Sequence, residues 1–434
     1  MNREMKDSGI PWTGEIPKGW QVNMLSSLFD EHKQKNKDLA ETNLLSLSYG
    51  KIVRKDINTK EGLLPESFDG YNVISRGDIV FRLTDLQNDK RSLRTGLCLE
   101  KGIITSAYVT IRERTPLNSS YFHYLLHSYD LCKVFYGMGD GVRQGMNYSD
   151  LRKLLVLQPS LAEQQKIAEF LDRKCSEIDE MVALQEKVIE ELKAYKQSVI
   201  TEVVTKGLTP NTPMRDSGIE WIGSIPEHWE VTKFYRICSV ITDFVASGSF
   251  ESLRINVPYL DYPDYAMLVR TVDLSGKGRT AEKVYISKHS YDFLSNSNLF
   301  GGEIILPNIG ASVGDVYIVP NLYERMSLAP NSIMFKTKQC DRYWYYYFYS
   351  EAGKQSIFDI CQSTAQPKFN KTELRDIRVC VPTKNEQQAI ADYLDEKCAD
   401  IDSLIQTKQS KIDSLKEYKK SIIYEYVTGK REVE

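Results

Sequence analysis

Two histidines are the first residues whose spacing could support chemistry. His123 and His127 stand four residues apart in a segment that reads as a short amphipathic helix, so both rings would project from one helix face. Histidines at this spacing can bind a metal ion. However, no glutamate follows His123, and a related segment at 343–350 holds Tyr345 and Tyr349 at the matching positions. We therefore expect an ordinary helix face and no metal site.

Motifs for nucleotide hydrolysis and methyl transfer are absent from the sequence. Gly-Lys pairs occur at 50–51, 276–277, 353–354 and 429–430, and none is followed by the Ser or Thr that a phosphate-binding P-loop requires. The sequence has no Asn-Pro-Pro-(Tyr/Phe) tetrapeptide and no credible glycine-rich methyl-donor loop. We therefore expect no cofactor in this chain, and we expect that it does not methylate adenine unaided.

Aromatic and cysteine residues are expected to pack rather than to react. The run Tyr343–Tyr349 invites a base-stacking interpretation, but its counterpart at 121–126 keeps the apolar character with fewer aromatic rings, which favours a core helix. Four tryptophans are likewise expected to be packing anchors, namely Trp12, Trp20, Trp221 and Trp229. The eight cysteines form no CxxC pair, and Cys175 and Cys398 are expected to be small buried residues.

The composition is that of an ordinary globular protein. The 434 residues are 41% hydrophobic and 26% charged, with a net charge of −3. The polar start is not expected to act as a signal peptide, and no run approaches the roughly 18 apolar residues of a membrane span. With the scattered cysteines, this predicts a cytoplasmic protein without a membrane partner. The charge neither favours nor excludes DNA, because residues 163–206 alone carry 10 acidic against 7 basic residues.

The sequence contains an internal repeat in the order A-B-A′-B′. Residues 5–22 (MKDSGIPWTGEIPKGWQV) and 214–231 (MRDSGIEWIGSIPEHWEV) are identical at 11 of 18 positions, at an offset of 209. Residues 151–206 and 374–429 are identical at 25 of 56 positions, at an offset of 223. The segments between these blocks have diverged, and the second copy is longer there by 14 residues. We therefore expect two related units, each followed by a B block.

The B blocks predict two long helices. Segments 160–206 and 383–428 are the longest without Gly or Pro, and Gly207 and Gly429 supply the stops. Ser160 and Glu163 fit a capping box, and each helix would reach about 65–70 Å. A heptad-like apolar stripe is expected on the first helix, at Ile178, Met181, Leu184, Val188, Leu192, Tyr195 and Val199. The second helix repeats it more weakly at Ile401, Leu404, Leu415, Tyr418 and Ile422, with Lys408 and Lys411 interrupting.

The segments between the blocks predict mixed strands and helices. The β-branched runs at 77–81 and 302–306 read as strands, and segments 121–128 and 343–350 read as short helices. The fold class is therefore α+β, with two globular units that are each followed by a long helix. The predicted domains are residues 1–159, a helical spacer at 160–207, residues 208–382 and a distal helical spacer at 383–434.

These features together resemble the specificity (S) subunit of type I restriction–modification systems. The likeness rests on the doubled opening DSGIxWxGxIPxxW, on the doubled helix entry EQQxIAxxLDxK at Glu163 and Glu386, and on the A-B-A′-B′ order. It covers essentially the whole chain. The resemblance implies two target-recognition domains, each reading one half of a split, asymmetric DNA sequence. It also implies that the helices pair as an antiparallel coiled coil with pseudo-twofold symmetry and hold the domains at a fixed distance.

The resemblance further implies that the chain is a non-catalytic subunit with several partners. These are double-stranded DNA, two modification (methyltransferase) subunits and the restriction subunits. S-adenosylmethionine would belong to the modification subunits, and ATP and magnesium to the restriction subunits. The assembled complex would be a site-specific adenine methyltransferase and an ATP-dependent endonuclease. Two alternatives stay open: a self-contained restriction or modification enzyme, which would need catalytic motifs in this chain, and a coiled-coil adaptor without DNA binding.

Candidate DNA contacts are basic and amide residues of the diverged segments, because Arg reads guanine edges in bidentate fashion and Lys mostly holds phosphates. In the first unit they are Tyr49, Lys51, Arg54, Lys55, Lys60, Arg82, Lys90, Arg91, Arg94, Arg143 and Gln144. In the second unit they are Arg254, Arg270, Lys277, Arg279, Asn308, Gln366 and Lys368. For any one of them, a solvated surface side chain is the competing interpretation.

Overall fold

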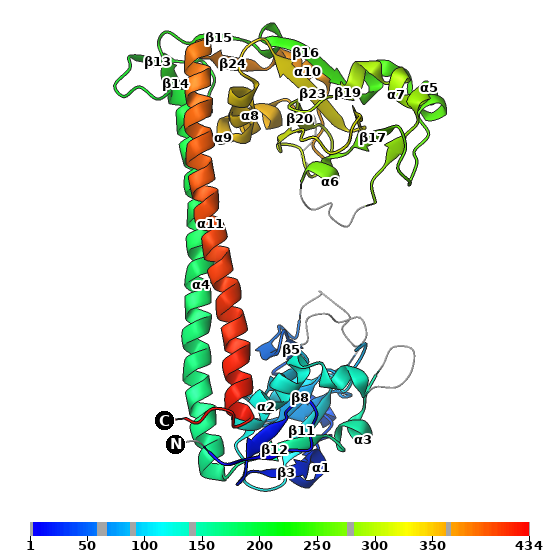
Figure 1. Ribbon diagram of the computed structural model, residues 1–434, viewed down its shortest axis with the longest axis vertical. Helices are drawn as coiled ribbons and strands as arrows, with labels where there is room; N and C mark the ends of the chain where they lie inside the picture. Colours follow the sequence, from blue (N-terminus) through cyan, green and yellow to red (C-terminus); the bar gives the residue numbers. More distant parts are fainter. Residues whose placement is uncertain are drawn as a thin grey trace. The chain divides into compact units, whose positions relative to one another are not determined.

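The computed structural model describes residues 3–58, 67–86, 93–138, 145–275, 282–361 and 366–433 (Figure 1). Contacts divide the chain into two units. Unit 1 is Met1–Glu186 together with Gln409–Glu434, and unit 2 is Lys187–Lys408. Each unit therefore contains one globular part and a portion of both long helices. The four domains expected from the sequence, with boundaries at 159, 207 and 382, stay a prediction.

The globular part of unit 1 is built from short strands and helices. Its elements are β1 (Met5–Asp7), β2 (Glu15–Pro17), β3 (Gln21–Met24), α1 (Leu25–Leu28), β4 (Phe29–Glu31), η1 (Lys37–Leu39), β5 (Leu45–Ser48), β6 (Lys51–Arg54), β7 (Asn72–Ile74), β8 (Ile79–Phe81), β9 (Thr95–Leu97), β10 (Gly102–Ile104), β11 (Val109–Glu113), α2 (Ser119–Leu131), η2 (Val134–Gly137), α3 (Tyr148–Leu151) and β12 (Leu155–Gln158). An antiparallel sheet in the order β4-β11-β8-β9 forms its centre. The predicted strand at 77–81 is confirmed as β8, whose three residues are fully buried.

The globular part of unit 2 repeats this sheet and has a second four-stranded sheet. Its elements are β13 (Met214–Asp216), β14 (Ser224–Pro226), β15 (Glu230–Lys233), η3 (Phe234–Arg236), β16 (Cys238–Asp243), η4 (Phe244–Ser247), α5 (Phe250–Asn256), β17 (Ala266–Val269), α6 (Thr271–Leu274), β18 (Tyr285–Ile286), α7 (Lys288–Phe293), η6 (Ser295–Ser297), β19 (Asn298–Leu299), β20 (Ile304–Pro307), β21 (Tyr317–Ile318), β22 (Met326–Leu328), β23 (Ser332–Thr337), α8 (Asp341–Tyr349), α9 (Glu351–Asp359), α10 (Lys371–Asp376) and β24 (Arg378–Val381). The sheet β16-β23-β20-β21 matches that of unit 1, and its strand β20 confirms the predicted strand at 302–306. The second sheet, β18-β17-β22-β19, pairs β17 and β22 in parallel. In unit 1 the antiparallel pairs β5–β6 and β7–β10 correspond to it, joined by a parallel bridge between Leu44 and Ile103.

Two long helices, α4 (Leu161–Lys206) and α11 (Lys384–Val427), lie side by side (Figure 1). They confirm the predicted helices to within one residue at each end. Gly207 and Gly429 follow them with φ angles of 75° and 70°, the left-handed conformation that commonly ends a helix. Neither of them, nor any other helix in the described ranges, is long and apolar enough to cross a membrane.

Ion pairs between the two helices give their direction. Asp179 pairs with Lys419 in unit 1, and Lys196 pairs with Asp402 in unit 2, each at 2.7 Å. Since the first half of α4 meets the second half of α11, the helices run antiparallel, as expected. At the repeat offset of 223 the two ion pairs are the same pair with the helices exchanged.

The buried seam between the helices differs in part from the predicted stripe. On α4 it follows alternating steps of four and three residues through Ile178, Val182, Gln185, Ile189, Leu192, Lys196, Val199 and Val203. On α11 the same positions are Ile401, Ile405, Lys408, Ile412, Leu415, Lys419, Ile422 and Tyr426. The predicted stripe was wrong at the following residues, which are about half exposed: Met181, Leu184, Tyr195, Leu404 and Tyr418. Two successive steps of three turn the helix about 120° away from the seam, because each residue turns it by 100°.

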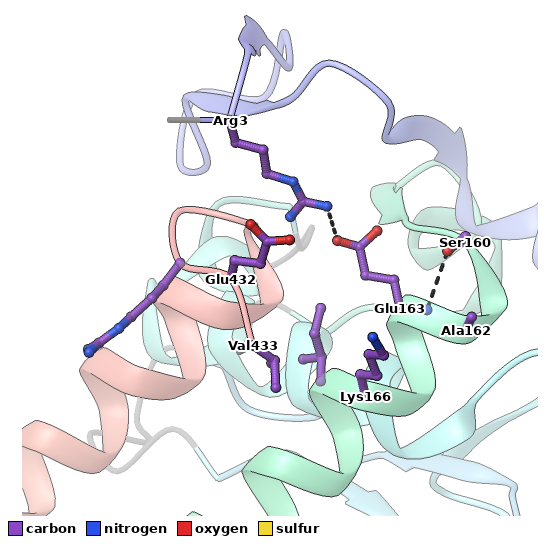
Figure 2. A pocket seen from close by; sticks show the side chains of 9 residues that line it. Arg3, Ser160, Ala162, Glu163, Lys166, Glu432 and Val433 are labelled. Atoms are coloured by element: carbon purple, nitrogen blue, oxygen red, sulfur yellow. Dashed lines mark hydrogen bonds and ion pairs between the residues drawn. The ribbon is translucent and has the colours of Figure 1, made fainter. Parts of the chain in front are cut away.

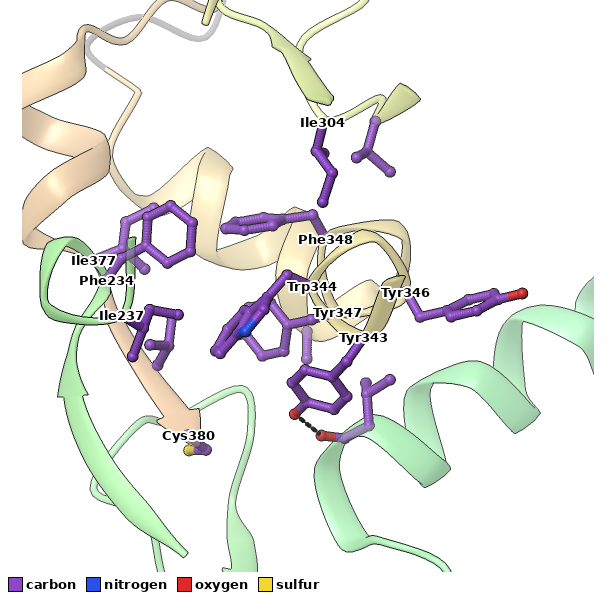
Figure 3. Packing of buried hydrophobic residues seen from close by; sticks show 14 of the residues in the cluster. Phe234, Ile237, Ile304, Tyr343, Trp344, Tyr346, Tyr347, Phe348, Ile377 and Cys380 are labelled. Carbon is purple, nitrogen blue, oxygen red and sulfur yellow. Dashed lines mark hydrogen bonds between the residues drawn. The ribbon is translucent and has the colours of Figure 1, made fainter. Parts of the chain in front are cut away.

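The short helices α2 and α8 lie in the cores of their units. Four aromatic residues of α8 are fully buried and pack together with Phe234 of η3 (Figure 3), namely Tyr343, Trp344, Tyr347 and Phe348. This confirms the expectation that the aromatic run packs in the core. These buried rings are therefore not available for base stacking.

The predicted packing anchors are also confirmed. Trp20 and Trp229 are buried, whereas Trp12 and Trp221 are half-buried. Cys175 and Cys398 are buried in the helices, and burial raises the pKa of the Cys175 thiol to about 11. A thiol with a raised pKa is a poor nucleophile at neutral pH, because the thiolate is the reactive form.

Candidate functional site

The first copy of the helix-entry motif attaches the start of α4 to the opening block of unit 1, residues 5–22. Ser160 Oγ accepts a hydrogen bond from Glu163 N at 3.3 Å (Figure 2), which is half of the predicted capping box. The Glu163 carboxylate pairs with Arg3 and accepts a hydrogen bond from Trp20 Nε1 at 3.0 Å. The glutamate therefore joins the two conserved blocks of the repeat instead of turning back to the backbone of Ser160.

The second copy keeps this attachment and completes the cap. Glu386 N donates to Thr383 Oγ1 at 3.4 Å, and Thr383 N donates to the Glu386 carboxylate at 3.0 Å. Trp229 Nε1 donates to the same carboxylate at 3.3 Å. The recurrence of Trp and Glu in both copies thus has one physical reason: an indole N–H must find an acceptor when the ring is buried.

A buried glutamine next to each of these glutamates holds two further segments, and it was missed as a functional residue by the sequence analysis. Gln164 Nε2 donates to Pro159 O at 2.9 Å, and its Oε1 accepts from Asn118 N, the cap of α2, at 3.0 Å. Gln387 makes the same pair of bonds, to Pro382 O at 2.9 Å and from Cys340 N at 3.4 Å. The Glu-Gln pair that recurs at the start of both long helices was the available signal.

A tyrosine in each unit holds the end of the other long helix. Tyr121 Oη of α2 donates to Val427 O of α11 at 3.1 Å, and Tyr343 Oη of α8 donates to Val204 O of α4 at 3.1 Å. Each globular part is therefore fixed to the start of one long helix and to the end of the other. The two units use the same contacts to achieve this.

A buried carboxylate, paired with a partly exposed cation, fixes the start of the central strand in each unit. Asp78, only 1% exposed, accepts two hydrogen bonds from Arg112 at 2.7 Å each. Glu303, also 1% exposed, pairs with Lys336 at 2.9 Å and accepts hydrogen bonds from Phe300 N and Gly301 N. A buried carboxylate needs such partners, because an unpaired buried charge is strongly destabilising. These pairs hold β8 and β20, whose ends lead into the diverged loops.

The loops that follow β8 and β20 meet a second diverged loop in the same unit. In unit 1, Met146 N donates to Leu83 O at 2.9 Å. In unit 2, Phe369 N donates to Asn308 O at 3.1 Å, and Asn308 Nδ2 returns a bond to Phe369 O at 2.9 Å. Lys368 bridges to Ile309. The structure therefore brings the candidates Asn308 and Lys368 together, with exposed Gln366 two residues before Lys368.

The β5–β6 hairpin presents four candidates of unit 1. Its turn is Tyr49–Gly50, with positive φ at both residues as a tight two-residue hairpin requires, and the Tyr49 side chain is 66% exposed. Lys51 lies 4.0 Å from Asp179 of α4, and Arg54 is paired with Glu100, with Nε 2.8 Å from Oε1. Lys55 is exposed. Tyr49, Lys51 and Lys55 are thus the residues that this hairpin offers to a ligand.

Arg82 and Arg94 have opposite environments. Arg82 is exposed directly after β8. Arg94 is 1% exposed, and its guanidinium donates to the carbonyl oxygens of Arg82, Thr84 and Asp85 at 2.8 to 3.1 Å. Because its guanidinium donates to three carbonyl oxygens of the loop, Arg94 stabilises the loop conformation and does not belong to the proposed DNA-reading surface.

The remaining candidates are divided between exposed, paired and undescribed positions. Arg254 is exposed on α5, whereas Arg270 is paired with Asp273 at 3.0 Å and donates to Glu282 O at 2.7 Å. Seven candidates lie outside the described residues, namely Lys60, Lys90, Arg91, Arg143, Gln144, Lys277 and Arg279.

His123 and His127 are half-buried in unit 1 and stack on each other, with ring centroids 6.2 Å apart. Burial lowers the pKa of His123 to about 4 and that of His127 to about 3. Both rings are therefore neutral at physiological pH. The part of the chain that the structure describes holds no group of three or more His, Cys, Asp or Glu side chains suited to a metal ion.

Comparison with known proteins identifies the family. The Type I restriction modification DNA specificity domain matches residues 227–427. The putative type I restriction enzyme MjaX specificity subunit of Methanocaldococcus jannaschii is 26% identical over 439 residues, covering 96% of this chain and 95% of that relative. The MjaVIII specificity subunit of the same organism is 25% identical over 76% of this chain and 75% of its own. Residues 227–427 therefore belong to this family of specificity domains, and the matches over the whole chain indicate a specificity (S) subunit of a type I restriction–modification system.

Solved structures share the fold of this S subunit. A chain from a study of complex assembly and conformational transition of a type I restriction–modification system matches with a TM-score of 0.69 at 13% identity, over 96% of this chain and 99% of its own. The HsdS subunit from Thermoanaerobacter tengcongensis matches with a TM-score of 0.52 at 15% identity, over 96% and 98%. Specificity subunits recognise a DNA target and are non-catalytic, in agreement with the lack of catalytic motifs in this sequence.

Proposed function

We propose that this S subunit reads a bipartite, asymmetric DNA target, one half with each unit. The carrying observation is that both globular parts are attached to the helix pair by the same contacts, while the loops at the ends of β8 and β20 differ completely in sequence. Two globular parts that recognise different DNA sequences need the same attachment to the helix pair and different loops for contacting DNA. The reading surface comprises the β5–β6 hairpin and the loop after β8 in unit 1, and the paired loops at Asn308 and Lys368 in unit 2.

The helix pair also carries two modification subunits in this proposal. Exposed apolar residues recur at repeat-equivalent positions outside the seam: Met181 matches Leu404, and Tyr195 matches Tyr418, all 50% to 54% exposed. Equivalent surfaces suit two copies of one partner. The modification subunits would supply adenine methylation with S-adenosylmethionine, and the restriction subunits would add ATP- and magnesium-dependent cleavage. The predicted cytoplasmic location belongs to this proposal as well.

Co-purification with the cognate modification subunit tests this function. The expected product contains two modification subunits per chain, and it methylates adenine at one motif, whereas neither component does so alone. Methylation by the purified chain alone would show a self-contained enzyme and overturn the proposal. A complex that binds and methylates DNA without any motif preference would identify the chain as an adaptor.

A further inference from the structure

Unit 2 carries a cluster of exposed cations that neither the candidate set nor the family membership assigns. We name it the η3–α10 basic cluster, and it consists of Lys233, Tyr235, Arg236, Lys338 and Arg375. The guanidinium carbons of Arg236 and Arg375 lie 5.9 and 5.6 Å from the centre of the Tyr235 ring. Lys338 Nζ donates to Arg236 O at 3.2 Å. Two guanidinium groups from different segments thus lie beside one phenol ring, and the Lys338 ammonium contacts the backbone of the neighbouring residue Arg236.

The cluster has an excess of positive charge. Lys233 is paired with Asp376 at 2.7 Å. Among the described residues, no carboxylate lies within ion-pair distance of Arg236, Lys338 or Arg375. The hydrogen bond and the charge of Arg236 hold the pKa of Tyr235 below its usual value, as a positive local potential does. The site therefore attracts anions.

The backbone beneath the cluster is fixed. Phe234 is fully buried and packs edge-to-face on Phe335 and Phe348 at 5.0 and 5.1 Å (Figure 3). Phe234 N donates to Ile377 O at 2.8 Å, and Lys338 N donates to Ile237 O at 2.8 Å. These bonds tie η3 to the end of α10 and to the residue after β23. Since the segments are already ordered, binding an anion here costs little conformational entropy.

The corresponding place in unit 1 keeps two of the cations. Arg152 matches Arg375 at the repeat offset of 223, and Arg114 matches Lys338, because Arg114 N donates to Leu28 O just as Lys338 N donates to Ile237 O. In unit 1, however, Arg114 is paired with Asp30 at 2.5 Å, and the strand register places Val240 at the position of Asp30 in unit 2. Unit 2 has therefore lost the counter-charge and kept the cation.

We propose that the η3–α10 basic cluster binds phosphate groups of the DNA backbone beside the half-site that unit 2 reads. Arginine side chains recognise phosphate with paired N–H donors, and such contacts position a protein on DNA without reading its sequence. The cluster is continuous with the reading loop, because α10 is capped by Asn370, two residues after Lys368. This inference rests on the proposed function and adds a sequence-independent anchor to it.

The test compares two triple variants in the complete complex with modification subunits. R236Q/K338Q/R375Q removes the cluster, and K288Q/R325Q/K354Q removes the same charge from cations that already lie beside Asp292, Glu324 and Glu351. The dissociation constant is measured over a range of salt concentrations on duplexes with the intact motif and with a mutated half-site. Each phosphate contact contributes about 0.9 to the slope of log affinity against log salt. The cluster variant should therefore lose up to about 2.7 of that slope and weaken equally on both duplexes.

Each outcome decides between distinct explanations. Equal salt slopes for the cluster variant, the control variant and the wild type would overturn the phosphate anchor. Loss of a modification subunit from the cluster variant, with an unchanged slope, would overturn it in favour of an acidic surface on that partner. Motif-independent binding by the wild-type complex would instead contradict the proposed function itself. Thermal unfolding of both variants confirms that they fold.

Discussion

Gln164 joins three segments through one buried side-chain amide, which makes it sensitive to truncation. Gln164→Ala leaves Asn118 N and Pro159 O without a partner in the interior, and such a loss costs about 1–3 kcal/mol per buried group. We expect a clearly lower melting temperature for this variant. Gln165→Ala is the matched control, because Gln165 is the exposed neighbour on the same helical turn. Equal melting temperatures for the two variants would contradict the role assigned to Gln164.

The histidine pair makes unit 1 sensitive to acid. Burial lowers the pKa of both rings from 6.5 to about 4 or below. Between these pH values the histidines are therefore protonated in the unfolded chain and neutral in the folded chain. The stability that depends on neutral rings is present above pH 6.5 and is lost as the pH falls toward 4. The variant H123Q/H127Q should therefore show a smaller drop in melting temperature between pH 7 and pH 4.5 than the wild type. An identical drop would exclude the pair as the cause.

The role of a single residue was predictable where the internal repeat contains it twice. It was not predictable where segments distant in the sequence determine whether the residue is buried. The tryptophans recur at fixed places in both copies, so their packing role followed from the sequence. Arg94 looked like any loop arginine, and only the approach of Asp130 and Tyr136 from α2 and η2 shows that it is interior. The η3–α10 basic cluster likewise combines Arg236, Lys338 and Arg375, which lie 37 to 139 residues apart in the sequence, and no local pattern reveals their proximity.

At the scale of elements, the seam and the outer face of the long helices can be separated by mutation. Ile412 is 1% exposed in the seam, and Ile412→Ala should cost about 2–5 kcal/mol through the cavity that it leaves. Leu404 is 50% exposed, and Leu404→Ala should change stability by less than about 0.5 kcal/mol while weakening capture of the modification subunit. Chemical denaturation and pull-down measure the two effects. A larger loss of stability for Leu404→Ala than for Ile412→Ala would instead support the apolar stripe that was predicted from the sequence.

The long helices and the strands β8 and β20 followed from the sequence, whereas the pairing of strands into sheets did not. Segments free of Gly and Pro, closed by Gly207 and Gly429, gave both helices to within one residue. Strands β8 and β20 were recognisable because buried β-branched runs are distinctive. The strands of the second sheet of unit 2 are only two to four residues long, and β17 pairs in parallel with β22 some 60 residues later. Such pairing depends on tertiary packing, so periodicity carries no signal for it.

At the scale of the whole molecule, the helix pair is proposed to set the spacing of the two half-sites. The ion pairs Asp179–Lys419 and Lys196–Asp402 have their midpoints near Lys187 and Ser410. Inserting seven residues after each of these two positions keeps the seam in register and lengthens the pair by about 10 Å. The methylated motif should then gain about three base pairs between its halves. Insertions of two residues turn the seam by about 200° and should abolish activity; full activity of that control would contradict the seam.

The central claim is that each globular part recognises its own half-site independently of the other. The most direct test is to exchange one globular part and then to map the methylated motif. Residues 20–150 are replaced by the same unit of another type I specificity subunit, and the hybrid is expressed with the cognate modification subunit. Single-molecule sequencing of the host DNA then reads every methylated adenine. We predict one bipartite motif in which one half-site has changed, while the other half-site and the spacing are those of the parent. Changes in both half-sites, or a motif without two separate halves, would contradict the account.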